Sequence, residues 1–150
     1  MSKAFTNEDA PAEATLVREP PQLAPGERRY ITPEGYRALQ AEHARLAREQ
    51  PGNPRVQWLQ VTLPLLTVFP PVRGDGRAVF GAWVTVEEET RARKTYRLVG
   101  PDEADVKTGL LSMTSPLARA LLGKEEGDTV VVASPRGSRE LTIVSIRYDA

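Results

Sequence analysis

Three carboxylates stand close together in the sequence, at Asp102, Glu103 and Asp105, directly after the dipeptide Gly100-Pro101. Carboxylate oxygens are the ligands that Ca²⁺ and Mg²⁺ prefer, but this spacing does not match an EF-hand loop. Thiolate ligands are excluded because the chain has no cysteine, and the lone His43 would need further ligands nearby. We therefore predict an exposed acidic loop, with no metal site and no cofactor.

The residue types that would make the chain an enzyme are also missing. With no cysteine, one histidine and no G-x-S-x-G elbow, the sequence indicates no activated nucleophile. The segment GDGR at residues 74–77 lacks the spacing and the Lys-Ser/Thr pair of a P-loop. We predict that the chain has no catalytic site of its own.

The acidic loop lies between segments that predict a small antiparallel sheet packed with one helix. Ser115 is a good N-cap, Pro116 suits the first helical position, and Gly123 suits the helix end. The apolar residues between them are spaced to put one face on a core, at Leu117, Ala118, Leu121 and Leu122. Alternating apolar residues and turn signals predict strands over residues 80–86, 94–99, 110–113, 129–133 and 141–148, with Phe80 facing the core in the first.

A helical hairpin is predicted before this sheet. Thr32 and Pro33 begin a helix, and its apolar stripe is Tyr36, Leu39, His43 and Leu46. The helix must end near Gln50, because residues 51–54 are four consecutive turn formers. A shorter return helix ends near Leu63, because Pro64 interrupts it, and extended chain follows. Alternatively, residues 61–69 form a strand, since β-branched residues are frequent there.

Composition limits the remaining possibilities. The 150 residues have a formal net charge of zero, so no overall field draws the chain to nucleic acid or membrane. No apolar run is long enough for a transmembrane helix, and the absence of cysteine fits a reducing cytoplasm. We expect a cytoplasmic monomer of the α+β class. Its organisation would be a disordered tail (1–29), a helical hairpin arm (30–69), a linker (70–78) and a sheet domain (79–150).

Several segments, in this order, resemble the GreA/GreB family of bacterial transcription elongation factors. VGPDEAD and SPLARALLG resemble its C-terminal domain, FGAWVTVE resembles the first strand of that domain, and KEEGDTVVVASPRG resembles the strand and turn after its helix. ITPEGYRALQ resembles the start of the family's N-terminal coiled-coil arm. The resemblance covers residues 30 to 148 and is GreB-like. It implies an FKBP-like fold for the sheet domain and a short antiparallel coiled coil for the arm.

The resemblance also implies a partner, bacterial RNA polymerase, bound at the rim of its secondary channel. The positions that match the docking motif are Asp102, Glu103, Ser115, Pro116 and Arg119. Indirect contact with nascent RNA or DNA in the elongation complex would follow from that location. Ser115 and Pro116 are also sufficiently explained as helix cap and first-turn residues.

The predicted arm differs from the family members that stimulate transcript cleavage. Those members carry an acidic tip of the type D-x-S-E-N-A-[DE]-Y, whose carboxylates help to hold a second magnesium ion. Here the corresponding segment reads REQPGNPRV, with Glu49 as its only acid between Arg48 and Arg55. The first arm helix would be only about 27 Å long at 1.5 Å per residue. We therefore predict polymerase binding without stimulation of cleavage.

Two alternatives remain at this stage. An FKBP-type prolyl isomerase would need several aromatic residues around one pocket, and the sheet domain offers Phe80, Trp83, Tyr96 and Tyr148. A degenerate Gre relic, with a binding role only, would have an arm that unfolds independently of the sheet domain.

Overall fold

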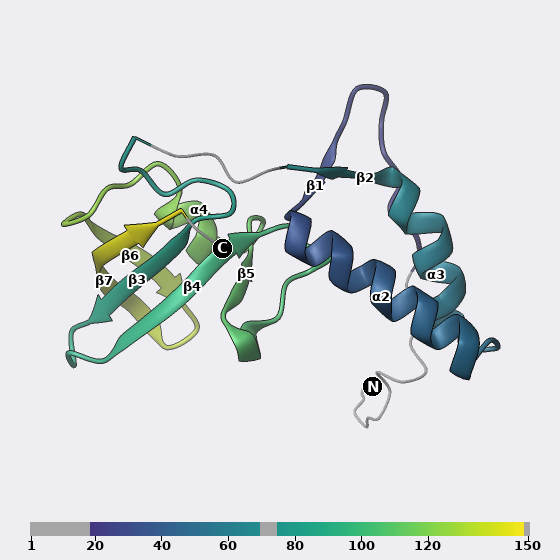
Figure 1. Ribbon diagram of the computed structural model, residues 1–150. Coiled ribbons are helices and arrows are strands. Elements are labelled where there is room, and N and C mark those ends of the chain that lie inside the picture. Colours follow the sequence, from purple (N-terminus) through teal and green to yellow (C-terminus); the bar gives the residue numbers. More distant parts are fainter. Residues whose placement is uncertain (1–18, 70–74, 149–150) are drawn as a thin grey trace, which may run out of the picture.

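Two groups of elements, one helical and one built on a sheet, make up the described chain (Figure 1). The computed structural model describes residues 19–69 and 75–148. The first group runs through β1 (Arg29–Ile31), α2 (Pro33–Glu49), α3 (Pro54–Thr62), a 3-10 turn (Leu63–Leu65) and β2 (Leu66–Val68). β1 and β2 pair in parallel, so the chain returns beside its own start after the two helices.

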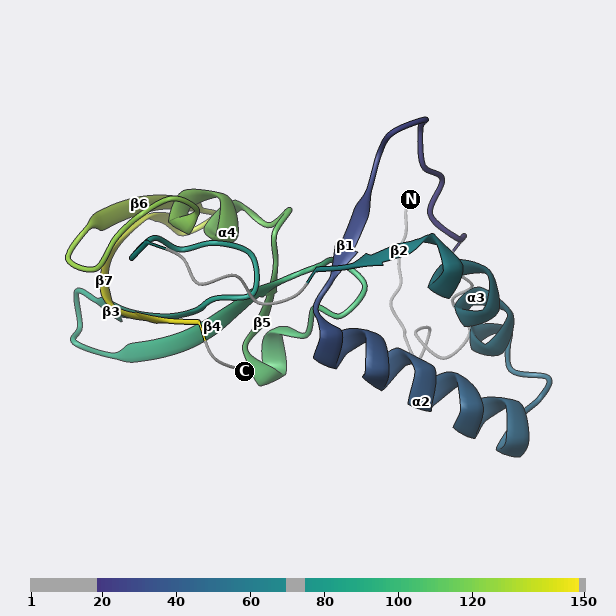
Figure 2. The same ribbon diagram turned by 45° about the horizontal axis from the view of Figure 1, so that its top comes forward.

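α2 begins where the sequence predicts, whereas α3 begins at Pro54, which the sequence analysis assigned to the turn. The Thr32 side chain accepts a hydrogen bond from the backbone N–H of Gly35, and Asn53 caps α3 in the same manner through Arg55 N–H. α2 and α3 lie side by side in both views (Figures 1 and 2). They enclose a small core of their own, made of Ile31, Leu39, Leu46, Trp58 and Leu59. The prediction of a return helix followed by extended chain is confirmed.

The second group is a five-stranded sheet in the order β5-β4-β3-β7-β6. Its elements are β3 (Trp83–Glu88), β4 (Arg93–Val99), β5 (Leu110–Ser112), α4 (Pro116–Leu121), β6 (Thr129–Ser134) and β7 (Gly137–Arg147). Figure 2 shows the sheet curling, with α4 on its concave side. Alternate residues of β3, including Val84 and Val86, meet Ala118 and Leu121 of α4 in the main core. The mixed α+β class is confirmed.

The sheet differs from the prediction in three details. β5 runs parallel to β4, so the sheet is mixed rather than antiparallel. β7 begins at Gly137, because the chain reverses over only Pro135 and Arg136 and pairs immediately with β6. Phe80 lies in a turn before β3 rather than in the strand, since Gly81 adopts φ 87° there.

The tail and linker boundaries also differ from the prediction. Residues 1–18 and 70–74 lie outside the described chain, but residues 19–29 do not. Trp58 donates its indole N–H to the Glu19 carbonyl, and Arg29 is part of β1. At the other boundary Ala78 is fully buried and its N–H donates to the Lys124 carbonyl. The disorder prediction is therefore wrong for residues 19–29, and the linker ends before Ala78.

Candidate docking surface and the contacts beside it

The N-terminus of α4 carries three of the five residues that the sequence singles out. Ser115 Oγ accepts a hydrogen bond from Ala118 N–H at 3.2 Å and donates one to the Ser112 carbonyl at 2.7 Å. Pro116 and Arg119 are exposed. The side chain of Arg119 has no ion-pair or hydrogen-bond partner among residues 19–69 and 75–148, so its guanidinium is available to another molecule.

Asp102 lies in a different environment from the one predicted. Its carboxylate accepts two hydrogen bonds from the Arg29 guanidinium, from Nε at 2.5 Å and from Nη2 at 2.9 Å. The Asp102 side chain is only 1% exposed and that of Arg29 is 29% exposed. The prediction of an exposed acidic loop is wrong at this position, because the loop after β4 lies against β1 and Arg29 covers the carboxylate.

Glu103 is also used inside the molecule. Its carboxylate accepts hydrogen bonds from Thr32 N–H at 2.8 Å, from the Thr32 hydroxyl, and from Gly100 N–H at 3.0 Å. Thr32 is the N-cap of α2, so this carboxylate lies at the positive end of the helix dipole. Asp105 remains exposed and caps a 3-10 turn through Lys107 N–H. The three acids therefore do not converge on one point, and no acidic, histidine or cysteine cluster suited to a metal ion occurs in the described residues.

Two glycines allow this close approach. A Cβ atom on Gly35, in the first turn of α2, would lie 1.9 Å from Glu103 Oε1. A Cβ atom on Gly100 would lie 2.0 Å from the Tyr30 carbonyl oxygen. Both distances are far below van der Waals contact. A larger residue at Gly100 would meet the backbone of β1 and push the loop away from it, whereas a larger residue at Gly35 would displace the Glu103 carboxylate from the cap of α2.

A second ion pair crosses between the two groups. Arg97 of β4 is 5% exposed, yet its Nη1 lies 3.1 Å from Glu34 Oε1 of α2 and its Nε donates to the Gly81 carbonyl. Its guanidinium also lies over the Trp83 ring, 5.5 Å from the ring centroid. Sequence reasoning did not single out Arg29 or Arg97. The one available signal was Arg97 itself, a charged residue between Tyr96 and Leu98 in a predicted strand.

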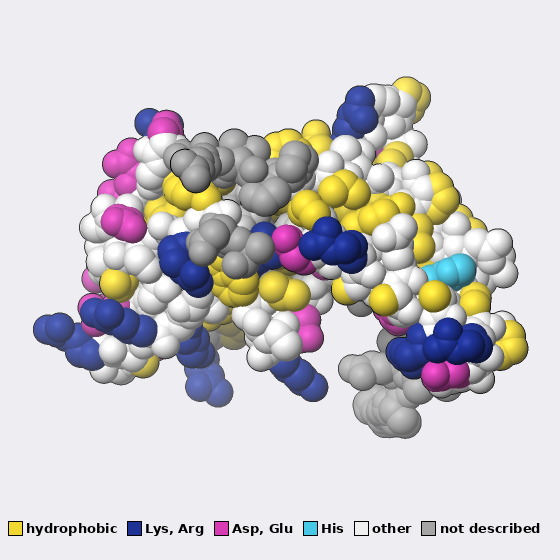
Figure 3. Space-filling view, in the orientation of Figure 1, with side chains coloured by type: hydrophobic (Ala, Val, Ile, Leu, Met, Phe, Trp, Pro, Cys, Tyr) yellow, Lys and Arg dark blue, Asp and Glu magenta, His cyan; other side chains and the backbone are white. Residues whose placement is uncertain are grey.

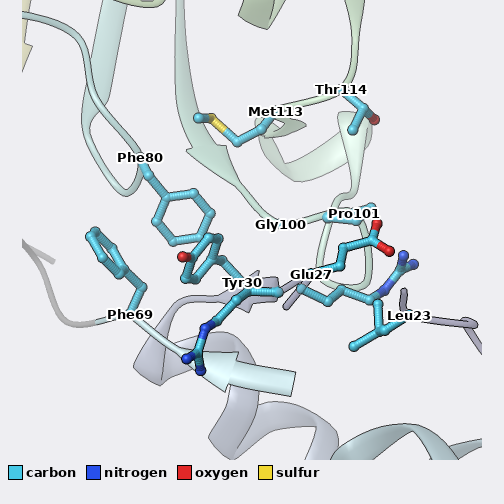
Figure 4. Close-up of a pocket in the computed structure, with 11 residues that line it drawn as sticks. Leu23, Glu27, Tyr30, Phe69, Phe80, Gly100, Pro101, Met113 and Thr114 are labelled. Carbon is cyan, nitrogen blue, oxygen red and sulfur yellow. The ribbon is translucent and has the colours of Figure 1, made fainter. Parts of the chain in front are cut away.

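A groove of about 460 Å³ lies between the two groups, next to the start of α4. Figure 4 shows the rings of Tyr30, Phe69 and Phe80 gathered in it, and their centroids lie 5.3 to 6.2 Å apart. Met113 and Thr114, the two residues before Ser115, form part of the lining. In Figure 3 hydrophobic side chains lie together over the region of β1 and β2, and Tyr30 is 41% exposed. The groove and the exposed residues of α4, Pro116 and Arg119, are therefore the candidate docking surface.

The turn between α2 and α3 is where a cleavage-stimulating tip would lie. Glu49 lies between two guanidiniums there, 3.6 Å from Arg45 and 3.8 Å from Arg48. Arg55 is close to Glu49 in the sequence only, since it pairs with Glu42 at 2.9 and 3.1 Å and stacks on Trp58. The single carboxylate at this end is therefore engaged by cations of its own helix.

None of the described helices is long and apolar enough to cross a membrane.

Comparison with known proteins agrees with the residue patterns. The family model "Transcription elongation factor, GreA/GreB, C-term" matches residues 73–148, about half of the chain. The chain is 48% identical over 95 residues to transcription elongation factor GreA of Cereibacter sphaeroides strain ATCC 17025, covering 63% of this chain and 61% of that protein. It is 48% identical over 107 residues to GreA of Alkalilimnicola ehrlichii, covering 68% of each.

Solved structures in the same group are more distant. Gfh1 (GreA factor homolog 1) of Thermus thermophilus matches 81% of this chain and 99% of its own, with a TM-score of 0.44 and 23% identity. The GreA/GreB factor of Nitrosomonas europaea has a TM-score of 0.45 and 22% identity, and its match also covers 81% of this chain and 99% of its own. The chain spans about three fifths of the length of the first curated relatives that it matches. On the family match and the GreA identities, the chain belongs to the GreA/GreB family of transcription elongation factors, with the family's C-terminal domain at residues 73–148.

Proposed function

We propose that this chain is an accessory factor that binds bacterial RNA polymerase at the rim of the secondary channel without stimulating transcript cleavage. The observation that carries the proposal is the family match over residues 73–148, which covers α4 and the sheet. Acting on the polymerase would place the protein in the cytoplasm, as a monomer, where it would meet nascent RNA or DNA only indirectly.

The docking residues in this proposal are Pro116 and Arg119, together with the aromatic groove. Both side chains are exposed, and the groove lining includes Met113 and Thr114, which precede α4 in the chain. Interface cores favour aromatic residues, methionine and arginine, which is the composition found here. Ser115 contributes by capping α4 rather than by contact. Asp102 and Glu103 contribute indirectly, because their carboxylates are bound within the chain.

The proposed lack of cleavage stimulation depends on the tip. A second magnesium ion needs several hard oxygen ligands, and Glu49 is the single acid of the 48–56 segment. Two arginines of the same helix lie within 4 Å of its carboxylate. The 17 residues of α2 span about 26 Å at 1.5 Å per residue, so the arm is also short. In this proposal residues 30–69 are a truncated coiled-coil arm and residues 79–150 an FKBP-like docking domain.

The two alternatives have less support. The four aromatic residues of the sheet domain do not share one pocket. Trp83 stacks with Arg97, and Tyr148 donates its hydroxyl proton to the Arg77 carbonyl. Tyr96 packs on the core, and Phe80 alone reaches the groove. This dispersion does not favour a prolyl isomerase. A degenerate relic is not favoured either, because ion pairs and hydrogen bonds of Asp102, Glu103 and Arg97 connect the helical group to the sheet.

The docking proposal is tested by measuring affinity for purified core RNA polymerase. Reversing the charge in Arg119→Glu should weaken binding by about tenfold if the guanidinium contacts the partner. Arg136→Glu is the matched control, since Arg136 is also an exposed arginine and lies on the β6–β7 turn. The proposal fails if the unmodified protein does not bind, or if the two variants bind equally well.

A further inference from the structure

Eight residues connect the helical group to the sheet, and we call this set the junction: Arg29, Thr32, Glu34, Gly35, Arg97, Gly100, Asp102 and Glu103. Its charged side chains are paired within the chain, although Glu34 Oε1 and Arg97 Nη2 are buried and make no hydrogen bond among the described residues. Asp102 binds Arg29, Glu34 binds Arg97, and Glu103 accepts hydrogen bonds at the N-terminus of α2. A basic partner surface would therefore have to break an internal contact before it could use Asp102 or Glu103.

The junction restrains α2 at three separate places. Arg29 lies on β1 and holds the loop after β4, Thr32 lies at the helix cap, and Glu34 reaches β4 itself from the first helical turn. Three contacts on β1, on the helix cap and on the first helical turn restrain the start of α2 against both the loop after β4 and β4 itself. The side chains at two of these places are almost completely buried, with Asp102 at 1% and Arg97 at 6% exposed.

The backbone reinforces the same restraint. Gly35 and Gly100 let α2 and β1 approach the loop after β4 so closely that a Cβ atom at either position would collide with a carboxylate or a carbonyl oxygen. Gly35 is otherwise an unfavourable residue for the first turns of a helix, because glycine costs about 1 kcal/mol relative to alanine. Close packing against Glu103 explains its presence.

We propose that Asp102 and Glu103 are positioning residues: through the junction they hold α2 in one direction relative to α4, so that docking of the sheet domain aims the α2–α3 turn. The inference rests on the proposed function, since the aim matters only if α4 docks on a partner. It assigns to these two acids a role in orientation rather than in contact.

The test uses a charge swap and two measurements. The variants are Arg29→Asp, Asp102→Arg and the double swap. The double swap restores an ion pair in which position 29 carries the acid and position 102 the base. The chain contains no cysteine, so Arg48→Cys and Arg136→Cys introduce two dye sites without competing thiols. Energy transfer between the dyes reports the orientation of α2 in the free protein. Polymerase affinity and the effect on RNA elongation are measured separately.

We expect each single reversal to broaden the distance distribution, to leave polymerase affinity nearly unchanged, and to weaken the effect on elongation by about tenfold, within the usual range of coupling between sites. The double swap should recover a narrow distribution of dye-to-dye distances and most of the effect on RNA elongation. A role limited to stability would lower all readouts in proportion to the folded fraction and would not separate affinity from effect.

Gly35→Ala provides a second variant that leaves every charge in place. It should broaden the distribution as the reversals do, while Gly52→Ala, with open space around its Cβ position, should not. The inference is overturned if the single reversals and Gly35→Ala keep a narrow distribution, or if they abolish polymerase binding outright, which would make the acids contact residues. Because the dye distances are measured without polymerase, failure of the proposed function leaves them unaffected and is recognised separately.

Discussion

At the residue scale, the carboxylate of Asp102 is the most consequential charge in the described structure. Its hydrogen bonds raise the pKa of Arg29 above the ordinary arginine value, against the lowering effect of burial. A group whose pKa is raised by folding increases the free energy of unfolding at pH values below its pKa in the unfolded chain. This stabilisation is lost only as the pH rises through the pKa of the folded chain. Because an unperturbed arginine titrates above about 12, the guanidinium remains charged at every working pH.

Asp102→Asn keeps the shape of the side chain and removes the charge opposite Arg29. Removing one member of a buried pair costs about 3–5 kcal/mol, and we expect about 2 kcal/mol here because Arg29 is 29% exposed. Urea unfolding measures the change. Asp105→Asn is the control, since asparagine caps as well as aspartate and Asp105 is exposed. Equal midpoints for the two variants would show that the pair contributes nothing.

Gly35→Ala tests the close approach of α2 to the loop after β4. Alanine usually stabilises a helix relative to glycine, but here we expect it to destabilise the protein. In an exposed helix the substitution stabilises by about 1 kcal/mol. Here the new methyl group would lie 1.9 Å from Glu103 Oε1, so we expect a lower unfolding midpoint. Gly52→Ala should be neutral or slightly stabilising, because nothing lies within 4 Å of its Cβ position. A stabilised Gly35→Ala protein would mean that the junction is looser than described.

At the element scale, the helix starts could be predicted because each signal is local. Thr32 and Ser115 stand immediately before a proline and cap the helices that follow. The junction could not be predicted in the same way, since Arg29 and Asp102 are 73 positions apart and nothing in either neighbourhood indicates the other. The sequence therefore pointed to Asp102 and Glu103 but not to what they contact. The parallel pairing of β5 was missed for the same reason.

The junction also predicts that the helical group and the sheet unfold together. The two tryptophans of the chain report separately, with Trp58 in the helical core and Trp83 on β3. Trp58→Phe and Trp83→Phe leave one probe each, and the two fluorescence transitions in urea should share one midpoint.

Adding Asp102→Asn to both probe variants should separate the two transitions, with the Trp58 signal changing at lower urea. Separate transitions in the unmodified background would instead indicate a helical arm that folds independently, as a degenerate relic would have.

At the scale of the whole molecule, the zero net charge leaves association to local surfaces. The groove with Tyr30, Phe69 and Phe80 lies near the start of α2 and is also lined by the residues before α4. Glu49, the single acid near the α2–α3 turn, is the last residue of α2. In the proposed function, docking and the family's cleavage chemistry would belong to different ends of the molecule. This separation explains how a member of the GreA/GreB family could retain the first property without the second.

The measurement that tests this account most directly is RNA cleavage in a backtracked elongation complex, with this protein alone and then in competition with an acidic-tipped Gre factor. We predict no cleavage above the background of the polymerase when the protein is alone, and suppression of the other factor when both are present. Cleavage by this protein alone would contradict the account, because Glu49 or another carboxylate would then have to reach the metal. Failure to suppress the other factor would contradict the shared docking site.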